Sequence, residues 1–227
     1  MVRTAVVLLC FVAGAWTSPG VFAQARAQAA PAPPLPAEIP LFPLPDVVLF
    51  PNLQRPLLIF EPRYREMLAD ALNGSRMLGM VVLRPGFEKD YDGRPPIYAV
   101  GCAGVIEEHE QLPDGRSIIL LRGLTRFRVL SEDQRKPYRL ARVEAIPERF
   151  TDADLGPLSA LRERLARLLV TVLPPNVDPP DPSTSDTEFV HVIAQALAMP
   201  VPDRQELLER DSVLARARAL VERLERR

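Results

Sequence analysis

Few residues of this 227-residue chain have the chemistry for covalent catalysis or metal binding. It contains two histidines, His109 and His191, two cysteines, and two lysines, Lys89 and Lys136, among 28 basic residues. A zinc site usually needs three or four ligands that converge on one point, and most of these are histidine or cysteine. Two separated histidines and so few cysteines cannot supply that set, so we expect no metal site.

The two histidines also lack a catalytic setting. His109 lies in the run Glu107-Glu-His-Glu110 near the end of an expected strand. Its acidic neighbours could raise its pKa or join it in binding a metal, but a solvated strand end is the simpler interpretation. His191 lies on an amphipathic helical pattern with no second ligand four residues on. We therefore expect His191 at the surface or partly buried.

Neither lysine resembles the buried, low-pKa base of a Ser-Lys peptidase. Lys89 lies between Glu88 and Asp90 in a polar loop, and Lys136 follows Arg135 and precedes a proline. The sequence has no G-x-x-x-x-G-K-[ST] phosphate-binding loop and no G-x-S-x-G nucleophile elbow. These patterns predict no catalytic residue, no ATP binding and no other cofactor.

The composition is that of an ordinary globular protein, with 47% apolar residues, 25% charged residues and a formal net charge of -1. A near-zero charge argues against a dedicated nucleic-acid binder. The densest basic patch, Arg122-Gly-Leu-Thr-Arg-Phe-Arg128, could contact RNA through arginine and an aromatic ring. Strand alternation places Leu124 on a different face from some of these arginines. We therefore prefer a solvated strand face to an RNA site.

Residues 1–23 have the layout of a secretory signal peptide. Arg3 is positive, residues 5–16 are apolar, and Val21-Phe-Ala23 resembles a cleavage site. The apolar run is too short to cross a hydrocarbon layer of about 30 Å. We expect cleavage after Ala23, export to the periplasm or the medium, and no membrane attachment afterwards. An uncleaved anchor is the alternative.

Cleavage would also change the inventory of reactive groups. It would remove Cys10 and leave Cys102 as the single cysteine. An exported protein with one cysteine has no internal disulfide. Because Cys102 lies in an apolar strand pattern, we expect a buried, unreactive thiol.

The rest of the chain divides into three stretches. Residues 24–38 are rich in alanine and proline and predict a flexible or polyproline-like lead. Residues 39–148 indicate short strands and one helix that begins at Pro62, and residues 149–227 indicate helices separated by proline-rich loops. Many short strands with glycine between them favour a curled, barrel-like sheet. The predicted class is α+β: a β-rich pseudo-barrel with one inserted helix, followed by a helical bundle.

Three local signals locate elements within this plan. The continuous apolar run of residues 77–83 predicts a buried strand. Pro113-Asp-Gly115 predicts a tight turn into a strand at residues 117–121, with a separate strand at residues 127–130. Ser185-Asp-Thr-Glu188 is a capping box that predicts a helix start.

Two segments together resemble the opening of the Lon protease N-terminal domain. They are Ile39-Pro-Leu-Phe-Pro-Leu-Pro-Asp-Val-Val-Leu-Phe-Pro51 and Pro56-Leu-Leu-Ile-Phe-Glu-Pro-Arg-Tyr64. The resemblance covers about residues 39–224, and it continues through Val100-Gly101, Asp114-Gly-Arg116, Gly123-Leu-Thr-Arg-Phe-Arg128 and Arg204-Gln-Glu-Leu-Leu208. It implies a PUA-like pseudo-barrel joined to a helical bundle. It also implies a polypeptide or protein partner, since this module of Lon proteases helps to recognise substrates and supports assembly.

The chain departs from Lon proteases in two ways. Their ATPase and Ser-Lys peptidase reside in later domains, and this chain ends before either, so we expect a stand-alone, non-catalytic module. The secretory signal is the second departure, since it leaves no obvious ATP-driven partner. A hydrolytic or peptidase-associated enzyme remains one alternative. Nucleic-acid binding by the PUA-like part remains another, because a fold does not decide a function.

The residues that carry the resemblance look architectural. They are Pro43, Leu44, Pro51, Pro56, Phe60, Glu61, Arg63, Tyr64, Gly101, Gly115, Gly123, Arg126 and Phe127. The prolines would fix strand ends, the glycines would permit turns or close packing, and Phe60 would anchor the core. Glu61 would lie at a helix N-terminus, where a carboxylate is favoured. We also hypothesise that Glu61 pairs with Arg126 or Arg63, because an unpaired charge among apolar residues is costly.

Overall fold

The structure of the protein is a computed structural model. It describes residues 34–91, 93–172, 180–181 and 183–226. The expected signal peptide, most of the alanine- and proline-rich lead, and most of the prolines between residues 173 and 182 lie outside these residues. The elements, in chain order, are β1 Glu38–Leu44, β2 Gln54–Ile59, α1 Pro62–Asn73, β3 Met77–Val82, a 3-10 turn Glu88–Asp90, β4 Val100–Gln111, β5 Ser117–Asp133, β6 Arg139–Ile146, α2 Asp152–Val172, α3 Asp186–Ala196, α4 Val201–Glu209 and α5 Val213–Glu225.

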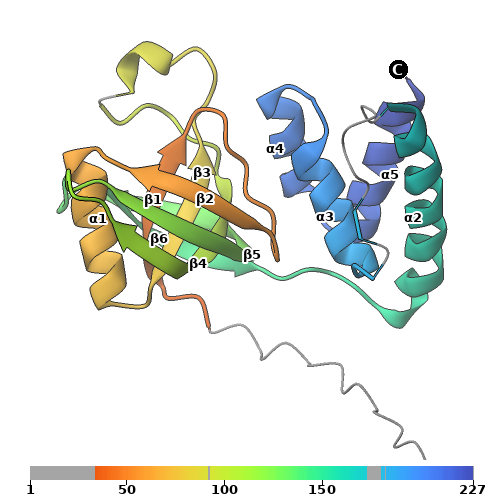
Figure 1. Cartoon of the computed structure of the whole chain (residues 1–227), viewed down its shortest axis with the longest axis horizontal. Helices are drawn as coiled ribbons and strands as arrows, with labels where there is room; N and C mark the ends of the chain where they lie inside the picture. The colour runs from red at the N-terminus through yellow and green to blue at the C-terminus, as the bar shows by residue number, and fades with distance from the viewer. Residues whose placement is uncertain (1–33, 92, 173–179, 182, 227) are drawn as a thin grey trace, which may run out of the picture. The chain divides into compact units, whose positions relative to one another are not determined.

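Within the described residues, six strands form one mixed sheet in the order β2-β5-β4-β3-β1-β6 (Figure 1). β1 and β3 run parallel, and the other neighbouring pairs run antiparallel. β5 is long enough to pair with β2 and β4 along its first part and with β6 along its last part. The sheet therefore curls back toward itself without forming a clearly closed barrel. The predicted α+β class is confirmed.

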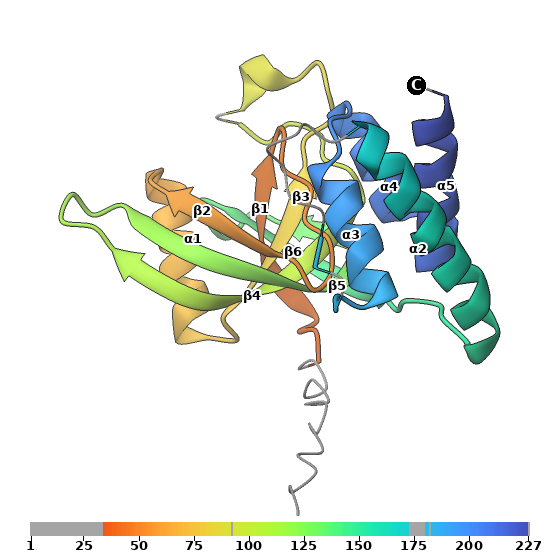
Figure 2. The same ribbon diagram turned by 45° about the vertical axis from the view of Figure 1, so that its right-hand side comes forward.

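β4 and β5 form a long hairpin that extends beyond the neighbouring strands (Figure 2). The amide of Leu112 donates to the carbonyl of Arg116 over 2.8 Å, and Gly115 has a φ of 82°. Only glycine adopts that region without strain, which confirms the turn predicted at this position. The two strands predicted at residues 117–121 and 127–130 are one continuous strand.

Within β5, another segment of backbone passes close to Gly123. A Cβ atom at Gly123 would lie 2.3 Å from the carbonyl oxygen of Phe50. The amide of Gly123 also donates to the carbonyl of Leu53 over 2.8 Å. A Cβ atom at Gly101 on β4 would lie equally close, 2.3 Å, to the carbonyl oxygen of Met80. Both glycines thus permit close packing, as the sequence predicted.

α1 packs against β1, β2 and β3. It begins with Pro62, and its buried residues follow helical spacing: Tyr64, Met67, Leu68 and Ala71. These side chains share a core with inward-facing residues of the strands, including Leu57 and Ile119. Proline at the first turn and apolar residues at helical spacing explain why the helix forms here. The buried strand predicted at residues 77–83 is β3, all of which is buried.

The remaining helices form a second apolar core. The Ser185 hydroxyl accepts a hydrogen bond from the amide of Glu188 over 3.3 Å, which confirms the predicted start of α3. α2 lies beside α5 (Figure 1), and their buried residues pack together with Phe50, Val82 and Val100 from the sheet side. Among the described helices, none is both long enough and apolar enough to cross a bilayer.

Candidate functional site

Most residues of the sequence motifs are buried and serve the fold. Pro43, Pro51, Tyr64 and Phe127 are buried, and Leu44 is half-buried. Pro56 differs from the prediction, because it lies inside β2 rather than at a strand end. A proline is tolerated there because β2 is an edge strand and pairs with β5 alone. The amide hydrogen that proline lacks is therefore not needed for pairing with a strand on the other side.

Phe60 contradicts the prediction of a core anchor, since 57% of its surface is exposed. It directly follows β2, where Leu57 and Ile59 face α1 and are buried. Successive side chains of a strand point to opposite faces, so Leu58 and Phe60 face outward. The sequence could not reveal this orientation, because residues 57–60 form an unbroken apolar run with no alternation.

The exposed side of β2 and β5 carries an apolar surface. Leu58 and Ile118 lie opposite each other on the two strands and are 42% and 40% exposed. Pro56 and Leu120 form another cross-strand pair on the same side, exposed and half-buried respectively. Together with Phe60, these four residues form what we call the β2–β5 face. Because folded proteins seldom leave neighbouring apolar side chains in water, this face is a candidate binding surface.

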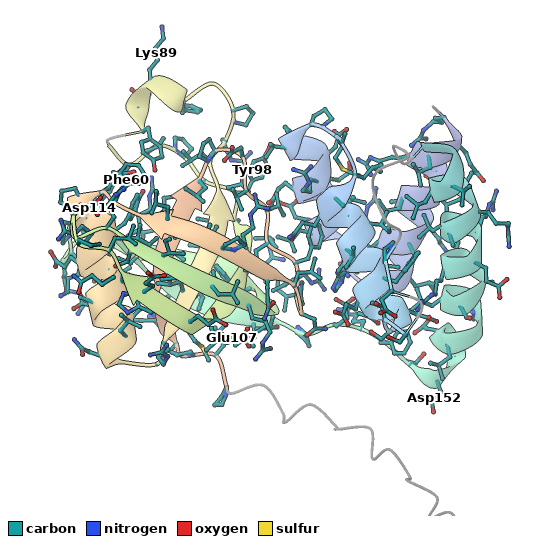
Figure 3. All side chains as sticks on the ribbon, viewed as in Figure 1. Phe60, Lys89, Tyr98, Glu107, Asp114 and Asp152 are labelled. Atoms are coloured by element: carbon teal, nitrogen blue, oxygen red, sulfur yellow. The ribbon has the colours of Figure 1, made fainter. Side chains whose placement is uncertain are left out.

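Acidic residues of β4 border the β2–β5 face. Glu108 and Glu110 are exposed and lie on the strand next to β5. Their neighbour Glu107 accepts from Arg122 over 2.5 Å and from the amide of Gln54 over 2.7 Å. These contacts hold the pKa of Glu107 below its usual range, with the Arg122 hydrogen bond as the largest cause. Figure 3 shows Glu107 on β4 and Phe60 at the α1 end of β2.

A polar cluster at the start of α1 confirms one of the two pairings proposed for Glu61. Nε of Arg63 donates to Oε2 of Glu61 over 2.9 Å, whereas Arg126 pairs elsewhere. The Tyr91 hydroxyl donates to the other carboxylate oxygen over 2.8 Å. Burial and this hydrogen bond raise the pKa of Tyr91. The Arg63 guanidinium also lies over the rings of Tyr64 and Tyr91, at 4.7 Å and 5.0 Å. The cluster thus fastens the loop after β3 to α1.

An open hollow of about 540 Å³ adjoins this cluster. It is lined by Phe60, Glu61, Pro62, Arg63 and Tyr91. Because Phe60 also belongs to the β2–β5 face, the hollow continues that face toward α1. It offers space for a side chain beside the exposed phenyl ring.

Arg126 is buried, so the interpretation of residues 122–128 as a solvated strand face is wrong at this position. Its guanidinium donates to the carbonyls of Leu208, Arg210 and Asp211 over 3.1, 2.6 and 3.2 Å. The segment after α4 therefore covers this part of β5. Alternation of polar and apolar residues cannot identify the solvent-facing side of a strand when both of its sides are covered. Arg126 joins the sheet to the helices and is not available to RNA.

His191 is also buried, which contradicts the expected surface or partly buried position. Its Nδ1 donates to the carbonyl of Pro51 over 2.9 Å, and its Nε2 accepts from Nη1 of Arg216 over 2.7 Å. Burial, followed by the neighbouring charge of Arg216, lowers its pKa to about 3. The imidazole is therefore neutral and held in one tautomer as a structural link between α3 and α5.

The other reactive groups of the described residues have no catalytic partners. Cys102 is fully buried, as predicted, and burial raises the pKa of its thiol to about 12. His109 is exposed near the end of β4, where its Nε2 lies 3.2 Å from the Ser117 hydroxyl. In the part of the chain that the structure describes, no group of three or more His, Cys, Asp or Glu residues could hold a metal ion.

Comparison with known proteins identifies the family. The model of the ATP-dependent protease La (LON) substrate-binding domain matches residues 38–226. The chain belongs to this family. The structural neighbours agree with this LON-type fold: a Lon N-terminal domain protein from Xanthomonas campestris has a TM-score of 0.59 at 23% identity, over 82% of this chain and 97% of that chain. The N-terminal domain of a Mycobacterium avium complex Lon protease has a TM-score of 0.60 at 17% identity, over 83% and 98%.

The curated relatives of this LON-family chain are much longer proteins. A Lon protease of Anaeromyxobacter dehalogenans is 29% identical over 223 residues, which cover 90% of this chain and 26% of that protein. Lon protease 2 of Sorangium cellulosum is 31% identical over 194 residues, which cover 81% and 24%. The chain thus spans about a quarter of the length of these relatives. The resemblance seen in the sequence is confirmed, and the fold supports a non-catalytic substrate-binding module.

Proposed function

We propose that this chain is a non-catalytic module that binds extended segments of polypeptide on the β2–β5 face. The observation that carries the proposal is the joint exposure of Leu58, Phe60 and Ile118 in a member of a substrate-binding domain family. Apolar segments become accessible when a client polypeptide is unfolded. Their burial against this face is favourable by roughly 25 cal/mol for each Å² of apolar surface removed from water.

Two further features of the surface suit an extended chain. β2 is the edge strand of the sheet, so its outer backbone groups are open to pairing with another strand. The hollow beside Phe60 can accept one side chain of the bound segment. Backbone pairing is independent of sequence, and a few apolar contacts select by side chain. This combination suits a module that binds many different unfolded clients.

The proposal includes export of the chain, on the basis of the signal-like pattern in residues 1–23. The test is N-terminal sequencing of the protein recovered from the exported fraction of cells that produce it. We expect a mature end at Gln24. A mature end upstream of Val21, or a protein confined to the cell interior, would contradict this part of the proposal.

Binding is tested by fluorescence anisotropy with labelled, unfolded casein. We expect Phe60→Ser and Leu58→Ser each to weaken binding at least about tenfold, because one buried apolar side chain contributes about 1.5 to 3 kcal/mol. Leu130→Ser is the matched control, since Leu130 is 57% exposed, like Phe60, and lies farther along β5. Absence of binding, or equal weakening by the control, would contradict the proposal.

The non-catalytic part is tested with the same casein. We expect mass spectrometry to detect no new fragments after prolonged incubation with the purified protein. Cleavage that a single substitution abolishes would show that the chain is a peptidase.

A further inference from the structure

Glu108 and Glu110 of β4 form an acidic border along the β2–β5 face. In the antiparallel register, Glu110 lies opposite Ile118 and Glu108 lies opposite Leu120. Ile118 in turn lies opposite Leu58 on β2. The same side of the three strands therefore presents two columns that are apolar at Pro56, Leu58, Ile118 and Leu120, followed by one acidic column. Gln54 and Arg122 continue the first two columns at their other end.

These two carboxylates are available to a ligand. Both are exposed, and among the described residues neither forms an ion pair. Arg122, two positions from Leu120 on β5, donates its hydrogen bond to Glu107. At the hairpin turn, Arg116 is held by Asp114 over 2.7 Å. The acidic border is thus not neutralised by the protein itself.

The spacing of a sheet determines how a bound segment meets this border. Neighbouring strands lie about 4.8 Å apart, so the acidic column is about 5 Å from Ile118 and about 10 Å from Leu58. Along an extended chain, side chains on one face repeat about every 7 Å. A segment that crosses the face, instead of pairing along the edge of β2, and places an apolar side chain between Leu58 and Ile118 can therefore place a long cationic side chain, a few positions away, beside Glu108 or Glu110.

We propose that the β2–β5 face selects segments in which an apolar residue is followed within about three positions by lysine or arginine. This inference rests on the proposed polypeptide binding and specifies its preferred clients. Opposite charges favour the basic segments, and like charges exclude acidic ones of equal hydrophobicity. Salt weakens the preference because the carboxylates are exposed.

The test uses three labelled peptides of one length that share a Leu-Phe core and differ only in flanking Lys, Gln or Glu residues. Anisotropy titrations at about 20 mM and about 500 mM salt give their affinities. At low salt we expect the order Lys, Gln, Glu, with about a fivefold step between successive peptides, as expected for exposed charge pairs. At high salt we expect the three affinities to converge.

Variants separate the acidic border from the overall charge of the protein. We expect the double variant Glu108→Gln and Glu110→Gln to bind the three peptides with equal affinity. Its affinity for the Gln peptide should remain that of the wild type. Glu144→Gln with Glu222→Gln is the charge-matched control on exposed residues of β6 and α5, and it should retain the order. Equal effects of both pairs would overturn the inference, because net charge would then explain the preference.

The outcome also distinguishes this inference from the proposed function. If the Gln peptide binds and the Lys and Glu peptides bind equally well at low salt, the charge preference is refuted and polypeptide binding stands. If none of the three peptides binds at either salt concentration, the proposed function fails and the inference fails with it.

Discussion

Arg216 on α5 donates a hydrogen bond to Nε2 of His191 on α3 over 2.7 Å. The other ring nitrogen of His191 donates to the backbone carbonyl of Pro51. The second guanidinium nitrogen of Arg216 donates to Glu148 over 3.0 Å. Glu148 lies between β6 and α2 and also approaches Arg126, with a closest distance of 3.7 Å. One buried polar network thus fastens the helices to the sheet that carries the β2–β5 face.

The stability of the protein should fall as the pH falls below about 6.5, because His191 must stay neutral in the folded state. Its pKa is lowered from 6.5 to about 3, so between these values the unfolded chain binds a proton that the folded chain does not. That difference destabilises the fold by about 2 kcal/mol at pH 5, relative to its stability above pH 6.5.

The measurement is urea unfolding from pH 4.5 to 8 for the wild type and His191→Gln. The variant should be less stable at pH 8 and should show a flatter pH dependence. His109→Gln is the control, since it removes an imidazole that lies at the surface. A wild-type slope that His191→Gln leaves unchanged would disprove the role assigned to this histidine.

Arg126→Met should destabilise the protein strongly. The substitution removes the donor to the carbonyls of Leu208, Arg210 and Asp211 and leaves Glu148 with one fewer cation. Loss of one partner of a buried charged network costs about 3 to 5 kcal/mol.

Arg128→Met makes the same chemical change two residues along β5, where the side chain is exposed. It should change the free energy of unfolding by less than about 0.5 kcal/mol. Urea unfolding of both variants provides the comparison. Equal stabilities would mean that Arg126 does not hold the helices to the sheet.

Two glycine substitutions should differ in their effect on stability. Gly123→Ala places a Cβ atom 2.3 Å from the carbonyl oxygen of Phe50, which requires a backbone shift. We expect a loss of about 1 to 3 kcal/mol, as for other overpacked positions. Gly156→Ala, in α2, adds a Cβ atom that meets nothing within 4 Å except its chain neighbours, and because one of these is Pro157 the usual gain of Ala over Gly in a helix is offset, so stability should change by less than about 0.5 kcal/mol. Thermal unfolding that shows an equal loss of stability for both would be inconsistent with the packing described.

Tyr91→Phe should loosen the loop after β3 without unfolding the protein. The variant loses the hydroxyl that donates to Glu61 over 2.8 Å, while Arg63 still pairs with that carboxylate. Hydrogen exchange of residues 84–99 should become faster. Tyr98→Phe is the control, because it removes a tyrosine hydroxyl from the same loop. Among the described residues this hydroxyl forms no hydrogen bond, so hydrogen exchange in the Tyr98→Phe variant should match that of the wild type. Similar exchange in both variants would argue against the tether.

The sequence sufficed for elements whose signals are local. Proline at the start of α1, glycine in the β4–β5 turn and the Ser185 cap each act through their immediate neighbours, and each was predicted correctly. The paired motifs also identified the family, because each motif combines several specific residues.

The sequence did not suffice where a position depends on packing between distant segments. Phe60 is exposed because Leu57 and Ile59 take the inner positions of β2. His191 and Arg126 are buried because the loop before β2 and the segment after α4 cover them. The β2–β5 face could not be predicted, since its two halves come from strands about 60 residues apart whose register is not evident from composition.

Site-specific photo-crosslinking tests the central claim most directly. A benzoylphenylalanine at position 118 would lie in the β2–β5 face, and one at position 130 would lie on an exposed part of β5 outside that face. With unfolded casein we expect strong cross-linking from position 118, suppression by an excess of an apolar peptide, and little cross-linking from position 130. Equal cross-linking from both positions, or cross-linking from position 130 alone, would contradict the assignment of the β2–β5 face as the polypeptide-binding surface.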